Sequence, residues 1–176
     1  MTILETARLR IRELRDDDLY GVFLLQSDPA VMRYIRPADT NPAVVRDRLV
    51  HWAEYHARHP KLGVFAMEIR DTESFAGYCT ARHMDFEAGR ALEIGYVLMP
   101  RFADQGLATE VASALTDYLF REMQAEKIVA VTDPNNTVSQ RVLDRCGFQQ
   151  AGIIGIYGAN CLLFERLRDQ ERPIVL

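Results

Sequence analysis

Glu93 lies in the middle of the run ALEIGYVL, whose apolar alternation is typical of a β-strand. On such a strand Glu93 and Gly95 share one face, and the glycine leaves room for a β-bulge or for a ligand close to the backbone. A carboxylate in this place can accept a proton from a bound molecule, directly or through water. It can equally form an ion pair with an arginine on a solvated face, and both interpretations stay open.

A second candidate site follows at once, in the segment RFADQGLATEV, where the strand is succeeded by a predicted helix. The first N–H groups of a helix have no partner inside it, and the helix dipole makes that end positive, so this turn could bind a pyrophosphate. The alternative is structural, with a glycine for a tight turn and alanines for close packing. The segment matches neither a P-loop nor GxGxxG. The residues concerned are Gln105, Gly106, Leu107, Ala108 and Thr109.

The segment DPNNTVSQRVLDRCGF contains the third candidate. Asn136 suits the N-cap of a helix, and Gly147 suits the left-handed residue that ends one. Ser139 lies three residues after Asn136, so both side chains fall on one side of the first helical turn. Capping and local backbone bonding would explain both residues. Their occurrence after Glu93 and the turn, in this order, favours a role in a shared site.

Histidine and cysteine give weaker signals. His51, His56 and His59 fall in one predicted helix, but no third ligand accompanies the two on one face, so we expect no metal site. Cys146 has no base nearby in the sequence, and its spacing from Val142 fits core packing. The three cysteines are odd in number and far apart, which indicates reduced thiols and a cytoplasmic protein.

The composition limits the classes of protein that remain. A chain of 176 residues with 48% hydrophobic and 26% charged residues fits one globular domain. The net charge of −4 argues against a nucleic-acid partner, which would require a basic face. No apolar run approaches about 18 residues, so no membrane span is expected. The polar start MTILETARLR predicts no secretory signal.

Periodicity predicts the elements that must position these residues. Short turns make the middle strands antiparallel, whereas a helix over about 107–119 must return the chain to a parallel strand at 127–133. The sequence therefore predicts a single α/β domain with a mixed sheet. Its strands are expected over 7–14, 63–70, 75–84, 91–99 and 127–133 with a terminal hairpin over 149–167, and its helices over 15–28, 28–35, 42–59, 105–119 and 135–148.

Three segments taken in order, LETARLRIREL, EIGYVLMPRFADQGLATEV and DPNNTVSQRVLDRCGF, resemble the GCN5-related N-acetyltransferase (GNAT) superfamily. Within it they resemble the RimJ/RimL-type branch of ribosomal-protein N-terminal acetyltransferases. The resemblance covers about residues 4–167 and implies an N-acetyltransferase domain over 1–170 with a tail over 171–176. It implies a mixed, mostly antiparallel sheet of about seven strands flanked by helices, with a splay between the strands at 91–98 and 127–133.

The resemblance also implies chemistry, namely transfer of an acetyl group from acetyl-coenzyme A to an amine that attacks directly. Glu93 would be the base, the backbone near Val97 would polarise the thioester, and Ser139 would contact the departing sulfur. The acceptor would be a protein N-terminus or a small-molecule amine, in a cleft built from about 28–41 and 152–161. The implied cofactor contacts are Tyr96, Val97, Leu98, Gln105, Gly106, Leu107, Ala108, Thr109, Asn136 and Ser139, with the pyrophosphate on the amides of 105–109.

Three positions depart from the superfamily pattern. Ala103 replaces the usual Gln or Arg, Asp104 replaces a usual glycine, and Leu143 stands where many members have a tyrosine. The departures keep a second hypothesis open, a module that binds coenzyme A or an acyl thioester without transferring anything. A purely structural α/β domain is the third. A homodimer is one arrangement that the sequence allows.

Overall fold

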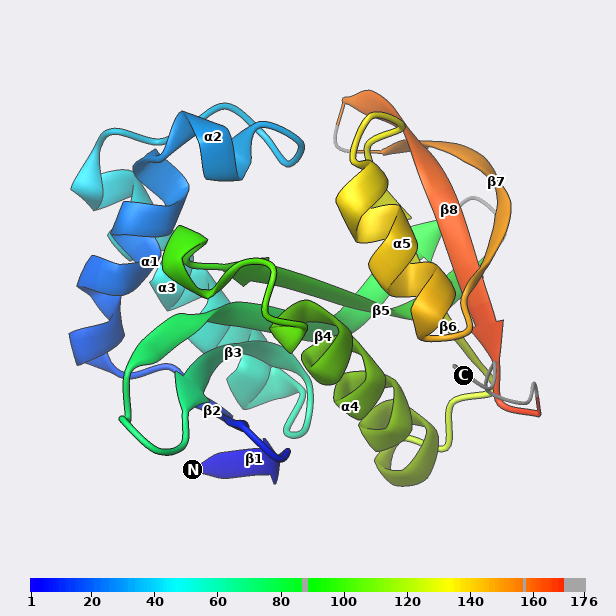
Figure 1. Cartoon of the computed structure of the whole chain (residues 1–176), viewed down its shortest axis with the longest axis horizontal. Helices are drawn as coiled ribbons and strands as arrows, with labels where there is room; N and C mark the ends of the chain where they lie inside the picture. The colour runs from blue at the N-terminus through cyan, green and yellow to red at the C-terminus, as the bar shows by residue number, and fades with distance from the viewer. Residues whose placement is uncertain (87–88, 157, 170–176) are drawn as a thin grey trace.

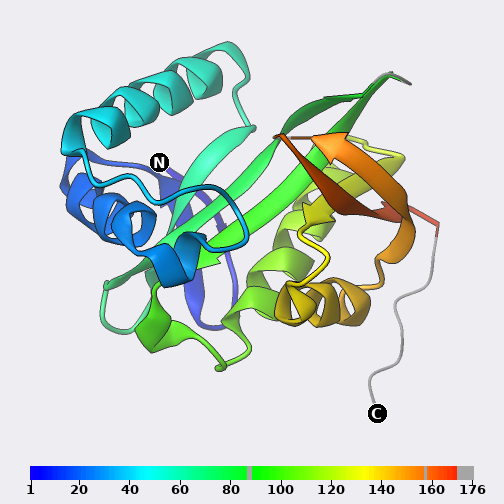
Figure 2. The ribbon, with the colours of Figure 1, turned by 90° about the horizontal axis from the view of Figure 1, so that it is seen from above.

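The protein is described by a computed structural model, which covers residues 1–86, 89–156 and 158–169. The predicted tail over 171–176 lies outside these residues, as does part of the segment between the strands predicted over 75–84 and 91–99. The described chain forms one sheet flanked by helices (Figure 1). Seen from above (Figure 2), the first three helices lie on one side of the central strands, and the last helix and terminal hairpin lie on the other.

The sheet has eight strands in the order β1-β2-β3-β4-β5-β6-β8-β7, and every neighbouring pair is antiparallel except β5–β6. The sequence predicted about seven strands. The additional one, β1, is only four residues long, which is too short for an alternating pattern to stand out. The strands are β1 (Thr2–Glu5), β2 (Leu9–Glu13), β3 (Gly63–Ile69), β4 (Phe75–Phe86), β5 (Gly89–Leu98), β6 (Lys127–Thr132), β7 (Gln149–Ile156) and β8 (Ala159–Leu167).

The helices begin where the sequence provides caps. Asp28 accepts hydrogen bonds from the first amides of α2, and Asn41 does so for α3, each directly before a proline that suits the first helical position. The helices are α1 (Leu19–Ser27), α2 (Pro29–Met32), α3 (Pro42–Arg58), α4 (Leu107–Glu122) and α5 (Thr137–Arg145), with short 3₁₀ turns η1 (Asp16–Asp18) and η2 (Pro100–Phe102).

The hydrophobic core lies on both faces of the sheet. On one face α4 presents Leu107, Val111, Leu115 and Leu119, as its sequence predicted, and all four are almost completely buried. On the other face a smaller cluster, with Val22, Leu25, Val45, Val64, Tyr78 and Met99 among its members, packs α1 and α3 against β3 and β4. Each face is therefore fixed by its own helices.

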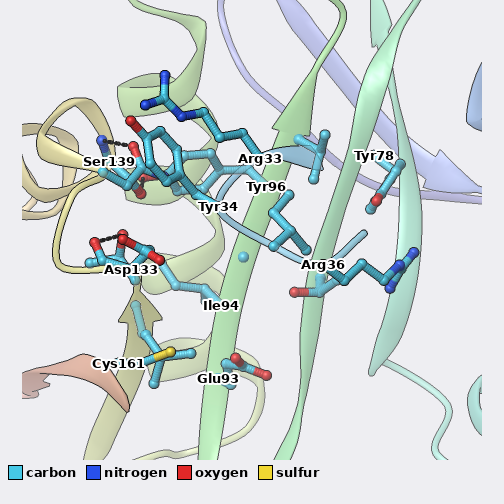
Figure 3. A pocket seen from close by; sticks show the side chains of 18 of the residues that line it. Arg33, Tyr34, Arg36, Tyr78, Glu93, Ile94, Tyr96, Asp133, Ser139 and Cys161 are labelled. Atoms are coloured by element: carbon cyan, nitrogen blue, oxygen red, sulfur yellow. Dashed lines mark hydrogen bonds between the residues drawn. The ribbon is translucent and has the colours of Figure 1, made fainter. Parts of the chain in front are cut away.

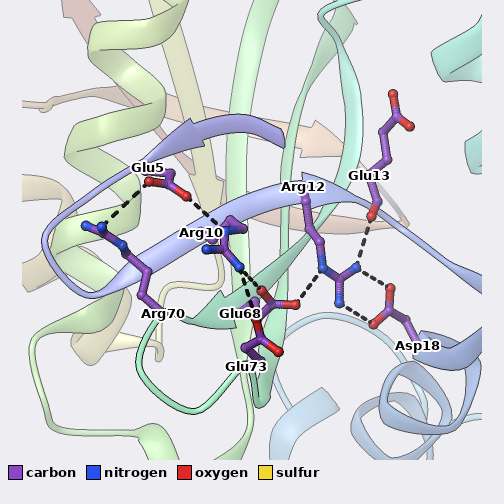
Figure 4. A network of polar contacts seen from close by, with 8 residues as sticks. All are labelled: Glu5, Arg10, Arg12, Glu13, Asp18, Glu68, Arg70 and Glu73. Atoms are coloured by element: carbon purple, nitrogen blue, oxygen red, sulfur yellow. Dashed lines mark hydrogen bonds and ion pairs between the residues drawn. The ribbon is translucent and has the colours of Figure 1, made fainter. Parts of the chain in front are cut away.

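A buried ionic network fixes the N-terminal part of the chain (Figure 4). Arg12 on β2 donates two hydrogen bonds to Asp18 of η1, at 2.7 and 2.9 Å, and one to Glu68 of β3 at 2.8 Å. All three residues are at most 5% exposed. Loss of one member of a buried ionic group typically costs about 3–5 kcal/mol. The network therefore holds η1, and with it α1 and the following segment, against the sheet.

Strands β5 and β6 diverge after a short pairing. They are paired only at Leu92–Ile128 and Glu93–Val129, although β5 continues to Leu98 and β6 to Thr132. Over those remaining residues β6 keeps its partner β8, and β5 keeps its partner β4. The predicted splay is thus confirmed. It leaves one edge of β5 open in the middle of the sheet.

Candidate active site

A cavity of about 700 Å³ opens where β5 and β6 diverge (Figure 3). Pro29 at the start of α2 and residues 33–38 after it contribute one wall. Ala159 and Cys161 of the terminal hairpin contribute to the opposite wall. These are parts of the two segments predicted to form the acceptor cleft, 28–41 and 152–161. Among the lining residues are the predicted site residues Glu93, Tyr96, Val97, Asn136 and Ser139.

The cavity reaches both faces of β5. Glu93 and Val97 alternate with Ile94 and Tyr96 along the strand, and all four line the same cavity. This is possible because β6 has moved away and no neighbouring strand closes the edge of β5 there. One molecule in the cavity can therefore approach β5 from the face that carries α4 and α5, while a second approaches β5 from the face that carries α1 and α3.

The floor on the α1 and α3 face is a ladder of cross-strand pairs between β4 and β5. Tyr78 is opposite Val97, Thr80 opposite Gly95, and Arg82 opposite Glu93. The register is regular here, so the β-bulge considered for Gly95 is not present. A Cβ at Gly95 would lie 2.7 Å from the Thr80 hydroxyl oxygen, so any larger residue would force the Thr80 side chain to move. The glycine therefore leaves room for the Thr80 hydroxyl in its present position.

Glu93 is buried but has a charged partner. Its side chain is 7% exposed, and its Oε2 accepts a hydrogen bond from Nε of Arg82 at 3.0 Å. The ion pair considered from the sequence is thus present. Because Glu93 and Arg82 both line the cavity, the pair also orients the carboxylate where a bound molecule can reach it.

Tyr96 contributes a side chain that the sequence did not single out. Its hydroxyl oxygen lies 3.1 Å from Oγ of Ser139, and Asn136 Oδ1 accepts a hydrogen bond from the Ser139 amide at 3.2 Å. Asn136 therefore caps α5, as predicted. Burial raises the pKa of Tyr96 well above its usual value, so the phenol stays protonated at neutral pH. The sequence analysis had named Tyr96 as a cofactor contact, without a role for its hydroxyl group.

The turn before α4 has the predicted open form. Gly106 is the N-cap at φ +77°, in the left-handed region, and makes no side-chain capping bond. Leu98 and residues 105–109 do not line the cavity; they follow it along the chain, at the end of β5 and the start of α4. Nη1 of Arg8 donates to the Gln105 carbonyl oxygen at 2.8 Å, and Arg8 also pairs with Glu110 at 2.7 Å. Through these two contacts Arg8, which lies between β1 and β2, holds the turn in position.

Asp104 adopts φ +58°, a left-handed conformation that asparagine, aspartate and glycine tolerate best. The aspartate thus keeps the backbone shape of the glycine that it replaces, but adds an exposed negative charge.

Asp104→Asn is expected to strengthen coenzyme A binding about two- to five-fold at low salt, the range measured for exposed charge interactions. Calorimetry would show this, and the gain should shrink as salt is added. Asp17→Asn, at an exposed position in η1, should change nothing; an equal gain there would indicate a net-charge effect.

Comparisons with known proteins agree with this geometry. The geometry to be compared is a sheet split between β5 and β6 next to a helix that begins without a side-chain cap. The model of the acetyltransferase (GNAT) domain family matches residues 8–149. The chain belongs to the GNAT acetyltransferase family, whose members use acetyl-coenzyme A as a co-substrate.

Three similar proteins illustrate the relationship. An uncharacterized N-acetyltransferase, p20, from Bacillus licheniformis is 30% identical, with 89% of this chain and 88% of that protein covered. The crystal structure of a GNAT-family acetyltransferase from Bacillus anthracis has a TM-score of 0.81 and 24% identity, covering 97% of this chain and 100% of that one. RimL, a ribosomal L7/L12 α-N-protein acetyltransferase in complex with coenzyme A, has a TM-score of 0.80 and 17% identity, with 97% and 100% covered. The predicted resemblance to the RimJ/RimL type is thus confirmed for the fold.

No helix in the described ranges combines the length and apolar character needed to cross a membrane. Across those same ranges, no three side chains of His, Cys, Asp or Glu gather in a way that would hold a metal ion.

Proposed function

We propose that this protein transfers the acetyl group of acetyl-coenzyme A to an amine, which attacks the thioester directly while both substrates are bound. The observation that carries the proposal is the cavity at the splay of β5 and β6, which is open on both faces of β5. One face adjoins the start of α4, and the other adjoins the segment after α2. Donor and acceptor can therefore meet there without a covalent enzyme intermediate.

The donor would occupy the open edge of β5. A pantetheine arm carries amide groups, and the backbone groups of Tyr96 and Leu98, which point to the open edge of β5, offer them the hydrogen bonds that a neighbouring strand would otherwise make. The pyrophosphate would lie on the amides of residues 105–109, at the positive end of α4. This placement would bring the thioester to the part of β5 between Glu93 and Val97.

Proton transfer would use Glu93 at the start and Ser139 at the end. An amine is mostly protonated at neutral pH, so a base must remove a proton before attack. Glu93 would do this directly or through water, with Arg82 holding the carboxylate in place. A backbone N–H near Val97 would polarise the thioester oxygen. The Ser139 hydroxyl would donate a hydrogen bond to the departing sulfur.

Tyr96 would orient that hydroxyl. If the phenol donates to Oγ of Ser139, the serine proton is left free to face the sulfur. Tyr96→Phe is expected to lower kcat about 2- to 12-fold, the range for one net hydrogen bond, while KM for acetyl-coenzyme A stays constant. In the double variant with Ser139→Ala, the two losses should not add, because they act through one contact. Additive losses in steady-state kinetics would contradict a shared role.

The acetyltransferase proposal is tested by incubating the purified protein with acetyl-coenzyme A and a panel of amines. The panel holds peptides with free N-termini, amino acids, polyamines and amine-bearing antibiotics, and free coenzyme A is followed with a thiol reagent. Release that depends on an amine, with the acetylated amine found by mass spectrometry, supports the proposal. Saturable binding of acetyl-coenzyme A without release for any amine would favour the non-catalytic binding module instead.

A further inference from the structure

The wall and floor of the cavity on the acceptor side contain more positive than negative charge. Arg33, Arg36 and Arg82 line the cavity, whereas Glu93 and Asp133 are the only carboxylates among its lining residues in the described part of the chain. Arg48 and Asp39 lie behind the wall and pair with each other at 2.8 Å, so they add no net charge. An ordinary cationic amine entering this side would meet a net repulsion.

The carboxylates near the cavity already have partners. Oε2 of Glu93 accepts from Arg82 at 3.0 Å. Oδ1 of Asp133 accepts from the backbone and side-chain amides of Asn135, at 2.7 and 3.1 Å. Neither contact involves Arg36. The excess positive charge of the cavity is therefore centred on Arg36 and Arg33, and Arg33 lies over the ring of Tyr34 at 4.9 Å.

Two of the three guanidinium nitrogens of Arg36 have no hydrogen-bond acceptor in the described part of the chain. Within the residues that the structure describes, its Nε and Nη2 are buried without a hydrogen-bond partner. Asp39 Oδ2 lies 3.6 Å from Nε, close enough for charge attraction but too far for a hydrogen bond. Burial, and next the nearby Arg48, lower the pKa of Arg36, although an arginine remains charged in proteins. The Arg36 side chain as a whole is 33% exposed and lines the cavity, so an anion in the cavity can approach the charge of its guanidinium.

The position of Arg36 places such an anion beside the reacting centre. Its guanidinium lies above the floor formed by β4 and β5, near Tyr78 and within the electrostatic influence of Arg82 (Figure 3). Tyr78 and Arg82 are paired across the strands with Val97 and Glu93. An anion held by Arg36 is thus next to the stretch of β5 where the amine would attack. One small molecule can present both groups.

We propose that the acceptor is a small amine that carries a carboxylate on the same molecule, of the amino-acid type, and that Arg36 binds this carboxylate. The inference rests on the proposed acetyltransferase function and specifies its substrate class. The carboxylate offsets the surplus positive charge by pairing with the exposed part of the Arg36 side chain, while its amine faces Glu93. Polyamines and other purely cationic amines are disfavoured by the same charge.

The test compares the common L-amino acids with their methyl esters, which keep the amine but lose the anion. We expect the wild-type protein to acetylate its best free acid at least about 10-fold more efficiently, in kcat/KM, than the matched ester. Arg36→Gln should lower kcat/KM for the acid about 10- to 100-fold, the range for a hydrogen bond to a charged group, and leave the ester unchanged. Arg36→Lys keeps the charge but not the fork of donors, so its loss should be intermediate.

Two controls separate binding from folding. Arg121→Gln changes an exposed arginine near the end of α4 and should leave the ratio of acid to ester intact. The acetyl-coenzyme A-induced rise in melting temperature should be the same in Arg36→Gln as in the wild type, because Arg36 lies on the acceptor side. With coenzyme A present, the preferred amino acid should raise the melting temperature further in the wild type but not in Arg36→Gln.

Equal rates for acids and esters, or an Arg36→Gln loss of the same size for both, would overturn the inference and leave the acetyltransferase function standing. Acetylation confined to peptides and unaffected by Arg36→Gln would do the same. If no amine of any class is acetylated while acetyl-coenzyme A binds, the proposed function fails, and the acceptor inference falls with it.

Discussion

Glu93→Gln is expected to lower turnover at pH 7 by about 10²–10⁴-fold, the usual contribution of a general base. The substitution keeps the size and much of the hydrogen bonding of the side chain, including an oxygen acceptor for Arg82. Acetyl-coenzyme A affinity should hardly change, because the proposed donor contacts are backbone groups. Steady-state kinetics with a verified acceptor, together with calorimetry for the donor, would measure both quantities.

The pH dependence gives the prediction a specific signature. As the pH rises toward the pKa of the acceptor amine, the free amine becomes abundant without help, so the deficit of Glu93→Gln should shrink. Glu165→Gln is the matched control, since Glu165 lies within β8, pairs with Lys127 at 2.7 Å and does not line the cavity. Near-normal turnover of Glu93→Gln at pH 7 would assign Glu93 a structural role, and the base would be another group or water.

Gly106→Val is expected to abolish the stabilisation of the protein by acetyl-coenzyme A. At a ligand concentration 100-fold above Kd, binding adds about 2.7 kcal/mol, which for a domain of this size raises the melting temperature by roughly 5–10 °C. A Cβ at Gly106 would lie 3.5 Å from Nη2 of Arg8, so space is sufficient. The obstacle is φ +77°, which a β-branched residue avoids, so the turn must change shape and its amides must lose their alignment.

Gly158→Val is the matched control for that experiment. Gly158 has φ +78°, nearly the same strained conformation, and a Cβ there would meet nothing within 4 Å. Both variants should lose similar stability, about 1–2 kcal/mol for a side chain in the left-handed region. Only Gly106→Val should lose the response to acetyl-coenzyme A in a thermal shift assay. A full response in Gly106→Val would place the phosphates elsewhere.

Much of the arrangement was predictable because local patterns carry it. The alternation around Glu93, the spacing of Leu107, Val111 and Leu115, and the cap at Asn136 each report their surroundings within a few residues. The splay followed from the resemblance to a known family. These are features that neighbouring residues determine, or that the family fold implies.

The contacts that were missed join distant parts of the chain. Tyr96 and Ser139 are 43 residues apart, and the resemblance placed both at the cofactor site without indicating that their hydroxyl groups would meet. Arg36 lies in a segment without periodicity, so nothing in the sequence indicated that it would line the cavity with two of its guanidinium nitrogens covered. Gly95 was interpreted as room for a β-bulge or for a ligand. The residue opposite it, Thr80, can be identified only once the register of β4 and β5 is known.

The early separation of β5 from β6 has a consequence for how such a protein can diverge. An exposed strand edge offers the same main-chain groups whatever side chains the strand carries, so most substitutions there would leave donor recognition intact. The segment after α2 has no comparable backbone pattern to offer and must recognise its ligand with side chains such as Arg36. Mutations are therefore constrained unequally in the two parts of the site. Binding along β5 depends on the topology of the sheet, whereas binding by the segment after α2 can change through single substitutions.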